Sequence, residues 1–588
     1  MDKDTGKAFD YKLFRRLLRH VRPYALTFFG VALAAILLSG FAVLTPILVG
    51  EIVDNAITNM DSDKLLMLTL AMLGILLGEV ICQLLFNYYA SWLGESVIKD
   101  IRIRLFKHLM GFKMKYYDNS SIGVLVTRAV TDLQRIGEIF SEGFFMIVSD
   151  LLKMVVVAVV MLFVNWKLSL IVFAILPIIL YATRLFQKAM KVAFIEVRLQ
   201  VANLNSFVQE RISGMKIVQL FTREEIEREK FREINEKHQN AWLKTVWYNS
   251  IFFPIAEIVS SITVGLIVWY GGLQNVVNIS KEEYGTIFMF ILLSGMLFRP
   301  LRQIADKFNT LQMGMVAANR VFKILDTDSN IEDLGTVDSE YINGDIEFED
   351  VRFGYLEDEE VLHGVSFQVK AGETVAIVGA TGAGKSTIIN LLNRFYEIDS
   401  GSIKVDGIDI KEYKLNALRS RIAVVLQDVF LFADTIANNI SLKNDDVTDA
   451  DLEKAAKQIG VHDFILSLPG GYDYNIKERG TMLSSGQRQL IAFLRAYVSN
   501  PSILVLDEAT SSVDTYSEQL IQGATEKITE GRTSIIIAHR LATIKKADKI
   551  LVMHQGRIVE TGTHLELLRQ KGYYQNLYEA QFLVEEAV

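Results

Sequence analysis

Cysteine is almost absent from this sequence, because Cys82 is the only one among 588 residues. A single cysteine cannot close a disulfide within the chain, and it excludes a metal site built from several thiolates. Since Cys82 lies in an apolar run, we expect it to be a small buried side chain. An excess of basic charge is missing too, since the formal net charge is −8. Nucleic acid is therefore not expected to be the main partner.

Long hydrophobic runs are abundant, and hydrophobic residues make up 51% of the chain. They dominate up to about residue 300, whereas from Asp326 onward charged residues, glycines and short β-like runs are mixed. A chain of this length exceeds what one hydrophobic core usually serves. The fold class predicted is therefore multi-domain, with an all-α transmembrane part followed by a soluble α/β part.

Six segments are predicted to span a membrane, since about 20 helical residues cross a hydrocarbon core of about 30 Å. They are 24–49, 65–92, 144–164, 168–183, 246–271 and 284–298. The first has no charged residue and is too long for the core of a signal peptide, and no cleavage site follows it. The fourth and sixth are short, so we expect both to continue as helix beyond the bilayer. Prolines inside the spans are tolerated where neighbouring helices satisfy the freed carbonyls.

The distribution of basic residues predicts the orientation of the spans. The segment before the first span is basic, and so is the connection between the second and third spans, whereas the connection 50–64 is acidic. The basic side chains are Lys12, Arg15, Arg16, Arg19, Arg22, Lys99, Arg102, Arg104, Lys107, Lys113 and Lys115. We expect the N-terminus and, after an even number of spans, the C-terminal half to lie in the cytoplasm, with the chain in the cytoplasmic (inner) membrane.

Two connections, 95–143 and 184–245, are long and have a helical pattern throughout. We expect them to prolong the spans into the cytoplasm and to be joined at their tips by short crossing helices. Separate surface hairpins are the alternative, but the helical pattern runs unbroken into the spans.

A phosphate-binding loop follows the β-rich run 374–378. The sequence Gly379-Ala380-Thr381-Gly382-Ala383-Gly384-Lys385-Ser386 matches GxxxxGK[ST], with a strand before it and a helix, 387–395, after it. Its glycines let backbone N–H groups approach phosphates, Lys385 supplies charge for the β- and γ-phosphates, and the Ser386 hydroxyl can bind Mg²⁺. The cofactors predicted are ATP and Mg²⁺.

A second apolar strand, 503–506, ends in Asp507-Glu508. An acid at the carboxyl end of a buried strand beside a phosphate-binding loop suits Mg²⁺, so Asp507 is predicted as a metal ligand. Glu508 is then left to polarise the attacking water.

The segment Leu483-Ser484-Ser485-Gly486-Gln487 resembles the LSGGQ signature of the ABC (ATP-binding cassette) ATPases. Further family motifs follow in order: an aromatic residue that stacks on adenine, a Q-loop glutamine that joins Mg²⁺ to the membrane domain, an exporter-type X-loop, a D-loop and a switch histidine. They are matched here by Tyr355, Gln427, Glu478-Arg479-Gly480, Ser511-Ser512-Val513-Asp514 and His539. The membrane half resembles the exporters, with two intracellular loops matched at Tyr117, Asp118, Gly123, Arg128, Asp132, Glu210, Gly214, Gln219 and Phe221.

The resemblance covers about residues 10 to 580 and implies a half-transporter. Its parts are a transmembrane domain (1–325), a linker (326–343), a nucleotide-binding domain (344–580) and a tail (581–588). It implies catalytic roles for Glu508, His539 and Lys385, and Mg²⁺ binding by Ser386, Gln427 and Asp507. The ATP-binding residues implied are Tyr355, Gly379, Thr381, Gly382, Ala383, Gly384, Lys385, Ser386, Thr387 and Gln427.

In the family, ATP is held between the phosphate-binding loop of one subunit and the signature of the other. Ser484, Ser485, Gly486 and Gln487 would then act on the partner's ATP, and the partner would be a second half-transporter. Since every residue expected to act on ATP is present, we predict a homodimer, with a heterodimer as alternative. Ser485 and Leu490 depart from the family pattern, which commonly has glycine and arginine there, and we interpret both as tolerated variation.

Charged residues inside spans are the only indications of the substrate, because they are costly in lipid and usually face a cavity or a partner. The cavity candidates are Glu79, Gln83, Glu257 and Arg299. For Glu79 and Glu257, a hydrogen bond between helices remains as open as contact with substrate. Asp150 and Lys153 are expected to neutralise each other as i,i+3 neighbours. Carboxylates favour a cationic, drug-like amphiphile, and a lipid flippase is the alternative.

Other functions are disfavoured by particular features. A soluble ABC ATPase would lack the spans, an ATP-gated channel would be expected to have a regulatory insert or a degenerate site, and a peptide exporter with a protease would need a Cys/His domain before Tyr24. We therefore expect an ATP-driven exporter of amphipathic molecules across the cytoplasmic membrane, working with membrane lipids and not with nucleic acid.

Overall fold

The computed structural model describes residues 10–277, 284–339, 341–356, 359–507, 515–538 and 541–581. The chain divides into two compact units. The first contains residues up to Met110 together with Ser121–Asp328, and the second contains Gly111–Ser120 and the chain from Ser329 onward. The segment 111–120, which the sequence assigned to the transmembrane half, therefore packs with the second unit.

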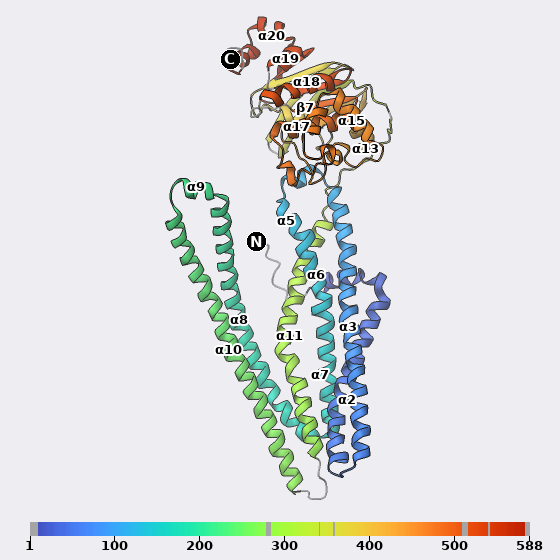
Figure 1. The fold of residues 1–588 in the computed structure, drawn as a ribbon, viewed down its shortest axis with the longest axis vertical. Coiled ribbons are helices and arrows are strands. Elements are labelled where there is room, and N and C mark those ends of the chain that lie inside the picture. Colours follow the sequence, from blue (N-terminus) through green and yellow to red (C-terminus); the bar gives the residue numbers. More distant parts are fainter. Residues whose placement is uncertain are drawn as a thin grey trace. The chain divides into compact units, whose positions relative to one another are not determined.

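The first unit is entirely helical (Figure 1). Among the described residues, six helices are long and apolar enough to cross a membrane, and each predicted span falls on one of them. The long helices are α2 (Ala25–Glu51), α3 (Ser62–Met110), α7 (Phe145–Val164), α8 (Trp166–Ser213), α10 (Glu224–Val277) and α11 (Tyr284–Leu325). The third span is approached through α5 (Ile122–Thr127), η3 (Arg128–Asp132), α6 (Leu133–Glu138) and η4 (Ile139–Phe144).

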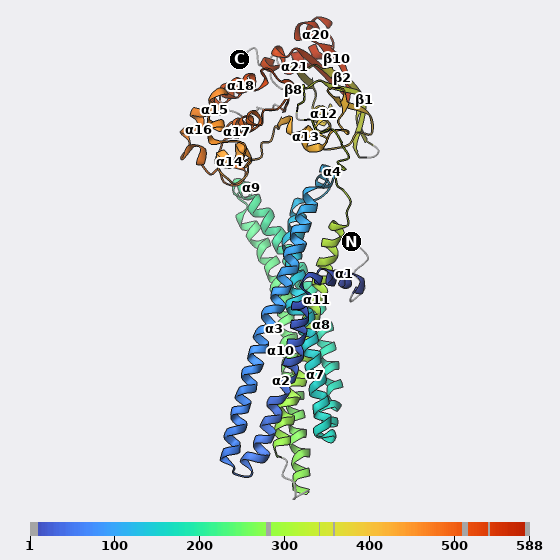
Figure 2. The same cartoon turned by 90° about the vertical axis from the view of Figure 1, so that its right-hand side faces the viewer.

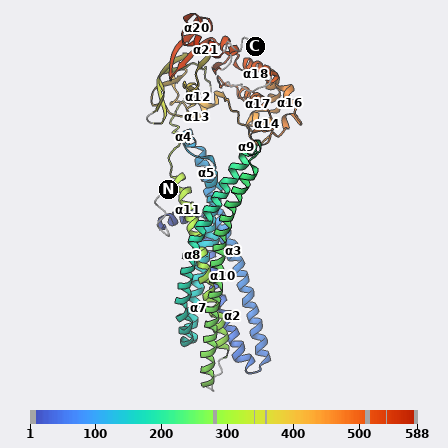
Figure 3. The same ribbon diagram turned by 90° about the vertical axis from the view of Figure 1, so that its left-hand side faces the viewer.

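The predicted helical extensions are confirmed, because α3, α8, α10 and α11 all continue well past the spans. Helices α8 and α10 run side by side, and α9 (Met215–Leu220) closes their tip (Figure 3). A second short helix, α4 (Met114–Asp118), follows α3. These are the two short crossing helices that the sequence predicted.

Close approach of α11 to its neighbours depends on glycine. A Cβ at Gly285 would lie 2.0 Å from the carbonyl oxygen of Gly50 in α2, and one at Gly314 would lie 2.7 Å from the carbonyl oxygen of Arg135 in α6. The Gly285 N–H also donates to Asp54 Oδ1 at 2.6 Å. Small residues at such crossings allow helix backbones to pack without the hydrophobic effect that operates in water.

Two expectations about the membrane half are wrong. Asp150 on α7 pairs with Lys307 on α11 and not with Lys153. The i,i+3 neighbour shares the surface of α7, but Asp150 is directed at the adjacent helix, which sequence spacing does not show. Cys82 is only partly buried, because the most apolar window of α3 has no buried residues in the single chain.

A short helix, α1 (Tyr11–Arg19), precedes the first span. The Asp10 carboxylate caps it by accepting from the N–H groups of Lys12 and Leu13 at 2.9 and 3.2 Å. Its Arg16 guanidinium donates to both carboxylate oxygens of Asp326, at 2.5 and 2.6 Å. This hydrogen bonding holds the pKa of Asp326 below its usual range. The contact ties α1 to the residue that directly follows α11.

The second unit has an antiparallel sheet and a mainly parallel one. The first sheet has the order β2-β1-β4-β5, formed by β1 (Ile346–Leu356), β2 (Glu359–Val369), β4 (Ser400–Val405) and β5 (Ile408–Asp409). The second has the order β10-β9-β3-β8-β7-β6, formed by β3 (Thr374–Gly379), β6 (Ile422–Val425), β7 (Ile503–Asp507), β8 (Thr533–Ile537), β9 (Lys549–His554) and β10 (Arg557–Gly562). Only β10 is antiparallel to its neighbour.

Helices cover these sheets and form a helical part of their own. In Figure 2, α14 to α18 gather on one side of this unit and β1, β2 and β10 on the other. The helices are α12 (Lys385–Leu392), α13 (Leu415–Ser420), α14 (Ile436–Ser441), α15 (Asp449–Gln458), α16 (His462–Ser467), α17 (Ser485–Val498), α18 (Thr515–Thr529), α19 (Leu541–Lys546), α20 (His564–Gln570) and α21 (Tyr573–Gln581). One hydrophobic core lies between the parallel sheet and these helices, and a second lies between the two sheets.

Candidate nucleotide site

The phosphate-binding loop leaves the parallel sheet at the carboxyl end of β3, whose four central residues are buried. Gly382 and Gly384 adopt φ of 83° and 98°, a left-handed conformation that glycine reaches without steric cost. Gly384 is the N-cap of α12, so the loop ends at a helix N-terminus. Backbone N–H groups at such a terminus are suited to phosphate oxygens.

Lys385, the first residue of α12, is buried beneath this loop. Its Nζ donates to the carbonyl oxygens of Gly379 and Ala380 at 2.7 and 3.0 Å. Burial lowers the pKa of Lys385, while the charge of Asp507 raises it. The ammonium group is therefore held within the loop by neutral carbonyls, which a phosphate can replace as partners.

Two predicted metal ligands approach each other at the same sheet edge. The Ser386 Oγ donates to Asp507 Oδ2 at 3.3 Å, and Asp507 is the last residue of β7. Gln427 follows β6, which pairs in parallel with β7, and its side chain is exposed. Oxygen donors on neighbouring strand ends form a set that fits Mg²⁺. The fold thus brings together Ser386, Asp507 and the strand end that precedes Gln427.

Glu508 and His539 lie outside the described residues. The strands that precede them, β7 and β8, pair in parallel with Asp507 opposite Ile537. Both strands therefore end at the edge where the phosphate-binding loop begins. Parallel α/β sheets bind ligands at this carboxyl edge.

Tyr355, predicted to stack on adenine, lies on β1 with its ring against α12. Its hydroxyl donates to Thr387 Oγ1 at 3.3 Å and accepts from Asn390 Nδ2 at 3.1 Å. Its ring also meets Tyr396 edge-on, with centroids 5.1 Å apart. These contacts fix the ring beside the phosphate-binding helix, so its position suits the base of a nucleotide bound at that loop.

The signature segment forms the N-terminus of α17. Ser484 is the N-cap, with its Oγ accepting from Gln487 N at 3.2 Å, while Gln487 Oε1 accepts from Ser484 N at 2.9 Å. Ser484 and Ser485 are exposed, and Gly486 is buried. The result is an exposed helix N-terminus with the polarity that attracts an anion.

Leu490, where the family commonly has arginine, is completely buried in the core between α17 and its neighbours. A buried arginine needs partners for its charge, whereas leucine fills such a core without them. The packing is therefore consistent with tolerated variation at this position.

Helix α4 contributes a contact that sequence reasoning did not identify. Tyr396, which follows α12, donates its hydroxyl to the Asp118 carboxylate at the end of α4. A backbone hydrogen bond also joins the residue before α4 to the start of the following chain segment of this unit, since Lys113 N donates to Ser329 O at 2.7 Å. Burial, followed by the hydrogen bond to Asp118, raises the pKa of Tyr396. Tyr396 thus contacts both Tyr355 and α4, and no local sequence signal marks it.

The four cavity candidates lie on three helices of the membrane unit. Glu79 and Gln83 are on α3, Glu257 is on α10 and Arg299 is on α11. Glu79 is partly buried, whereas Gln83, Glu257 and Arg299 are exposed in the single chain.

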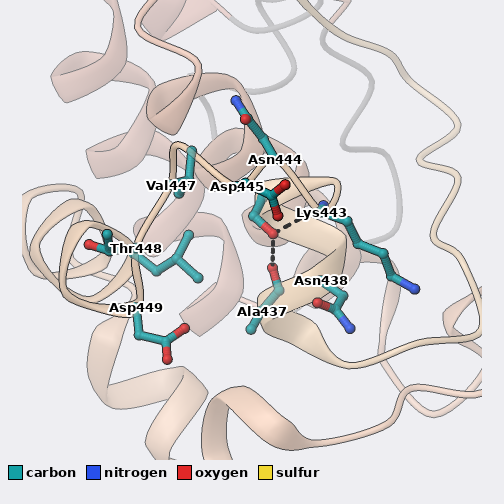
Figure 4. A pocket seen from close by; sticks show the side chains of 10 residues that line it. Ala437, Asn438, Lys443, Asn444, Asp445, Val447, Thr448 and Asp449 are labelled. Carbon is teal, nitrogen blue, oxygen red and sulfur yellow. Dashed lines mark hydrogen bonds between the residues drawn. The ribbon is translucent and has the colours of Figure 1, made fainter.

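A separate hollow of about 480 Å³ lies in the helical part of the second unit, between α14 and α15 (Figure 4). Ser441 Oγ donates to Ala437 O at 3.1 Å and accepts from Lys443 N at 3.2 Å along its wall. None of the nucleotide-site residues lines it. It plays no part in the arrangement around the phosphate-binding loop.

Comparisons with known proteins agree with this architecture. Residues 28–301 match the family model of the ABC transporter transmembrane region, and residues 362–511 match that of the ABC transporter. The ATP-dependent lipid A-core flippase of Yersinia pestis is 36% identical over 583 residues, covering 99% of each protein. The Uncharacterized ABC transporter ATP-binding protein YknV of Bacillus subtilis is 36% identical over 584 residues, covering 99% of this chain and 96% of the relative.

A solved structure is similar over almost the same length. It is described as a bacterial Atm1-family ABC exporter with ATP bound, and it is 28% identical with a TM-score of 0.74. The similarity covers 97% of this chain and 99% of that one.

Proposed function

The chain belongs to the ABC transporter family as an ATP-driven exporter, and on that premise we propose that two copies form a pump for amphipathic molecules. The observation that carries the proposal is the meeting of Ser386 and Asp507 beneath the phosphate-binding loop. It assembles a site for a nucleotide and its metal at the carboxyl edge of the parallel sheet.

Mg²⁺ would be held by Ser386 and Asp507, with Gln427 from the neighbouring strand end. A bound Mg²⁺ supplies positive charge that neutralises the phosphates during transfer. Lys385 holds the β- and γ-phosphates, and the N–H groups of Thr381, Gly382, Ala383, Gly384 and Thr387 complete their cradle. Gly379 allows the loop to turn out of β3, and Tyr355 stacks on the adenine.

Glu508 polarises the water that attacks the γ-phosphate, and His539 stabilises the transferring group. Both follow strands that end at the phosphate-binding loop. A carboxylate in that position orients the nucleophile, which is the main protein contribution to phosphoryl transfer beside charge stabilisation.

The ATP site is completed by a second copy of the chain. Ser484, Ser485, Gly486 and Gln487 form a helix N-terminus whose two serines are exposed, and this terminus would face the γ-phosphate held by the partner's loop. ATP would close the dimer, and hydrolysis would reopen it, so that the membrane cavity is exposed alternately to each side.

An exposed apolar tip supports dimerisation independently. On α9 and the residue after it, Ile217, Leu220 and Phe221 are 56%, 70% and 65% exposed. The tip lies far along α8 and α10 from the predicted spans, so lipid does not account for it. Exposed apolar patches of this kind mark protein interfaces, and a second copy of this chain is the partner proposed.

The proposed orientation places the N-terminus and the ATPase domain in the cytoplasm, with the spans in the cytoplasmic membrane. The basic residues before the first span and between the second and third spans support it. Transport then runs outward from the cytoplasm or the inner leaflet.

The substrate proposed is a drug-like, cationic amphiphile attracted by Glu79, with Gln83, Glu257 and Arg299 lining the path. Glu79 is partly buried and is the only charged residue in the sequence of the predicted span 65–92, where a carboxylate is costly without a function or partner. A lipid flippase is the second candidate, because relatives of which 99% and 94% is matched are named lipid A-core flippases.

Purified chain in proteoliposomes tests this choice. Replacing Glu79 with Gln keeps its shape and removes its charge, so transport of a cationic dye should fall several-fold while a neutral dye and basal ATPase change little. Glu95→Gln is the matched control, since Glu95 lies on the same helix beyond the span. Equal loss for both dyes would make Glu79 structural. Stimulation of ATPase by lipid A alone would favour the flippase.

A further inference from the structure

The helix α1 has two different faces, and only one of them is used by the fold. Phe14 and Leu17 are buried, and Phe14 meets Phe144 with ring centroids 5.3 Å apart. The opposite face carries Lys12, Arg15 and Arg19, and Arg22 continues it after α1, with all four side chains exposed. Positions spaced by three, four and three residues share one helix face.

The four cations have no acidic partner within the described part of the chain, in contrast to Arg16. No ion pair joins Lys12, Arg15, Arg19 or Arg22 to any described carboxylate, whereas Arg16 pairs with Asp326. A row of like charges without counterions repels itself, so an external anion stabilises it. The row ends at Arg22, three residues before the spanning helix α2 begins.

The location of these four basic side chains, directly before α2, indicates which kind of anion they bind. A short amphipathic helix directly before a spanning helix lies at the level of the lipid headgroups. Basic residues at a membrane surface are attracted to anionic lipids, and the attraction falls off within a Debye length. The charge and the location together fit the headgroups of an anionic phospholipid.

We propose that Lys12, Arg15, Arg19 and Arg22 form a binding surface for anionic phospholipid headgroups, which adjusts the activity of the ATPase through Arg16 and Asp326. Arg16, partly buried at the edge of this row, has its guanidinium 4.2 Å from the Phe322 ring centroid near the end of α11. Asp326 follows α11, and the second unit's chain resumes at Ser329. Headgroups that hold α1 therefore hold the end of the helix from which the ATPase domain continues.

The test uses the full chain in nanodiscs of phosphatidylcholine with increasing phosphatidylglycerol. We expect phosphatidylglycerol to raise ATPase activity in the wild type, and we expect a variant with Lys12, Arg15, Arg19 and Arg22 changed to Gln to lose that response. Native mass spectrometry should show about tenfold weaker retention of phosphatidylglycerol by the variant, because each cation contributes to the attraction.

A matched control removes the same charge elsewhere. Lys411, Lys454, Arg569 and Lys571 are exposed in the ATPase domain, and their replacement by Gln should leave the lipid response unchanged. A variant with lysine at positions 15, 19 and 22 should also keep it, which separates charge from folding. An unchanged response in the four-Gln variant, or an equal loss in the control, would overturn the proposal.

A separate variant tests whether bound headgroups act on the ATPase through the pair of Arg16 and Asp326. Asp326→Asn weakens the pair with Arg16 and leaves the four cations in place. Retention of phosphatidylglycerol should then match the wild type, while the ATPase no longer responds to it. If Asp326→Asn keeps the full response, the headgroups do not act through α11.

Discussion

At the scale of single residues, hydrolysis is expected to depend on Glu508. Changing Glu508 to Gln removes the carboxylate that polarises water but leaves the phosphate-binding loop intact. Hydrolysis should fall by about 10²–10⁴-fold, the usual contribution of a positioned base, while ATP binding is retained. Single-turnover hydrolysis and nucleotide binding on the purified protein measure the two effects.

A control for this change is Glu530→Gln, because Glu530 is an exposed carboxylate of the same domain whose one ion pair among the described residues is with Lys527, at 3.6 Å. It should leave hydrolysis unaltered. Near wild-type turnover in the Glu508 variant would assign the role to another residue.

Tyr396 is predicted to couple the nucleotide site to α4. Its hydroxyl is bonded to Asp118, and its ring touches Tyr355. Tyr396→Phe keeps the ring and removes the bond, so α4 should follow the nucleotide less closely. We expect basal ATPase to stay within about twofold, while transport per ATP falls several-fold, since a hydrogen bond to a charged group is worth about 1.5–3 kcal/mol.

Tyr413→Phe is the control for Tyr396, because it removes a buried hydroxyl from the same domain. That hydroxyl donates to Val405 O at 3.1 Å, away from α4. Both variants should lose some stability, but only Tyr396→Phe should lower transport per ATP. Equal ratios in the two variants would leave Tyr396 a purely structural role.

The residues of the phosphate-binding loop could be predicted because their chemistry is contained in eight consecutive positions. The partners of Tyr396 and Asp150 could not, since they lie 278 and 157 residues away. An i,i+3 spacing suggested Lys153 for Asp150, but the helix that packs against α7 supplies Lys307. Such pairs depend on tertiary packing that no local pattern contains.

At the scale of elements, the six spans were predictable because each must bury its own backbone polar groups within about 20 residues. The prolonged helices were predictable because their pattern continues without an interruption. The membership of 111–120 in the second unit was not, since it arises from contacts of α4 that hydropathy does not record. The close contacts of Gly285 and Gly314 in α11 could not be predicted from composition either.

Helix packing at α11 leads to a prediction about Gly285. Its Cβ would lie 2.0 Å from a backbone oxygen of α2, so Gly285→Ala must push the helices apart. Overpacking typically costs about 1–3 kcal/mol, and we expect a lower thermal midpoint in detergent with correspondingly reduced transport. Thermal unfolding followed by intrinsic fluorescence measures the shift.

Gly295 is the control on the same helix, because nothing lies within 4 Å of a Cβ placed there. Gly295→Ala should leave the midpoint unchanged or raise it slightly, as alanine favours helix. If Gly285→Ala is equally harmless, the close approach of α2 and α11 is not needed for stability.

At the scale of the whole molecule, one chain contains one phosphate-binding loop and one signature. In the proposed mechanism these two belong to different ATP sites, so a single chain completes neither site. Chain expressed alone should therefore purify as an active homodimer, with two equal sites. A preparation that remains monomeric or inactive would indicate a different second subunit. Burial of the exposed apolar side chains at the tip of α9 would also favour dimerisation.

Composite sites predict that two inactive variants restore each other. Lys385→Ala removes the charge that holds the phosphates, and Ser484→Asp places a negative charge at the surface that meets the partner's ATP. Aspartate caps a helix about as well as serine, so α17 should remain folded and the variant should still bind ATP at its own loop. Each variant alone should form dimers with both sites defective.

Mixed dimers carry both defects in one site and leave the other site intact. Co-expressing the two variants with different affinity tags, and purifying through both tags, isolates these dimers. We expect them to regain ATPase activity well above that of either parent, up to about half of the wild type if the sites work independently. Parental activity in the mixed dimer, with the tags confirming one copy of each variant, would mean that loop and signature serve the same chain or that both sites must fire together. Crosslinking cysteines placed at Ser484 and at Thr381 separates these two outcomes, because ATP should join them between chains only if the site is shared.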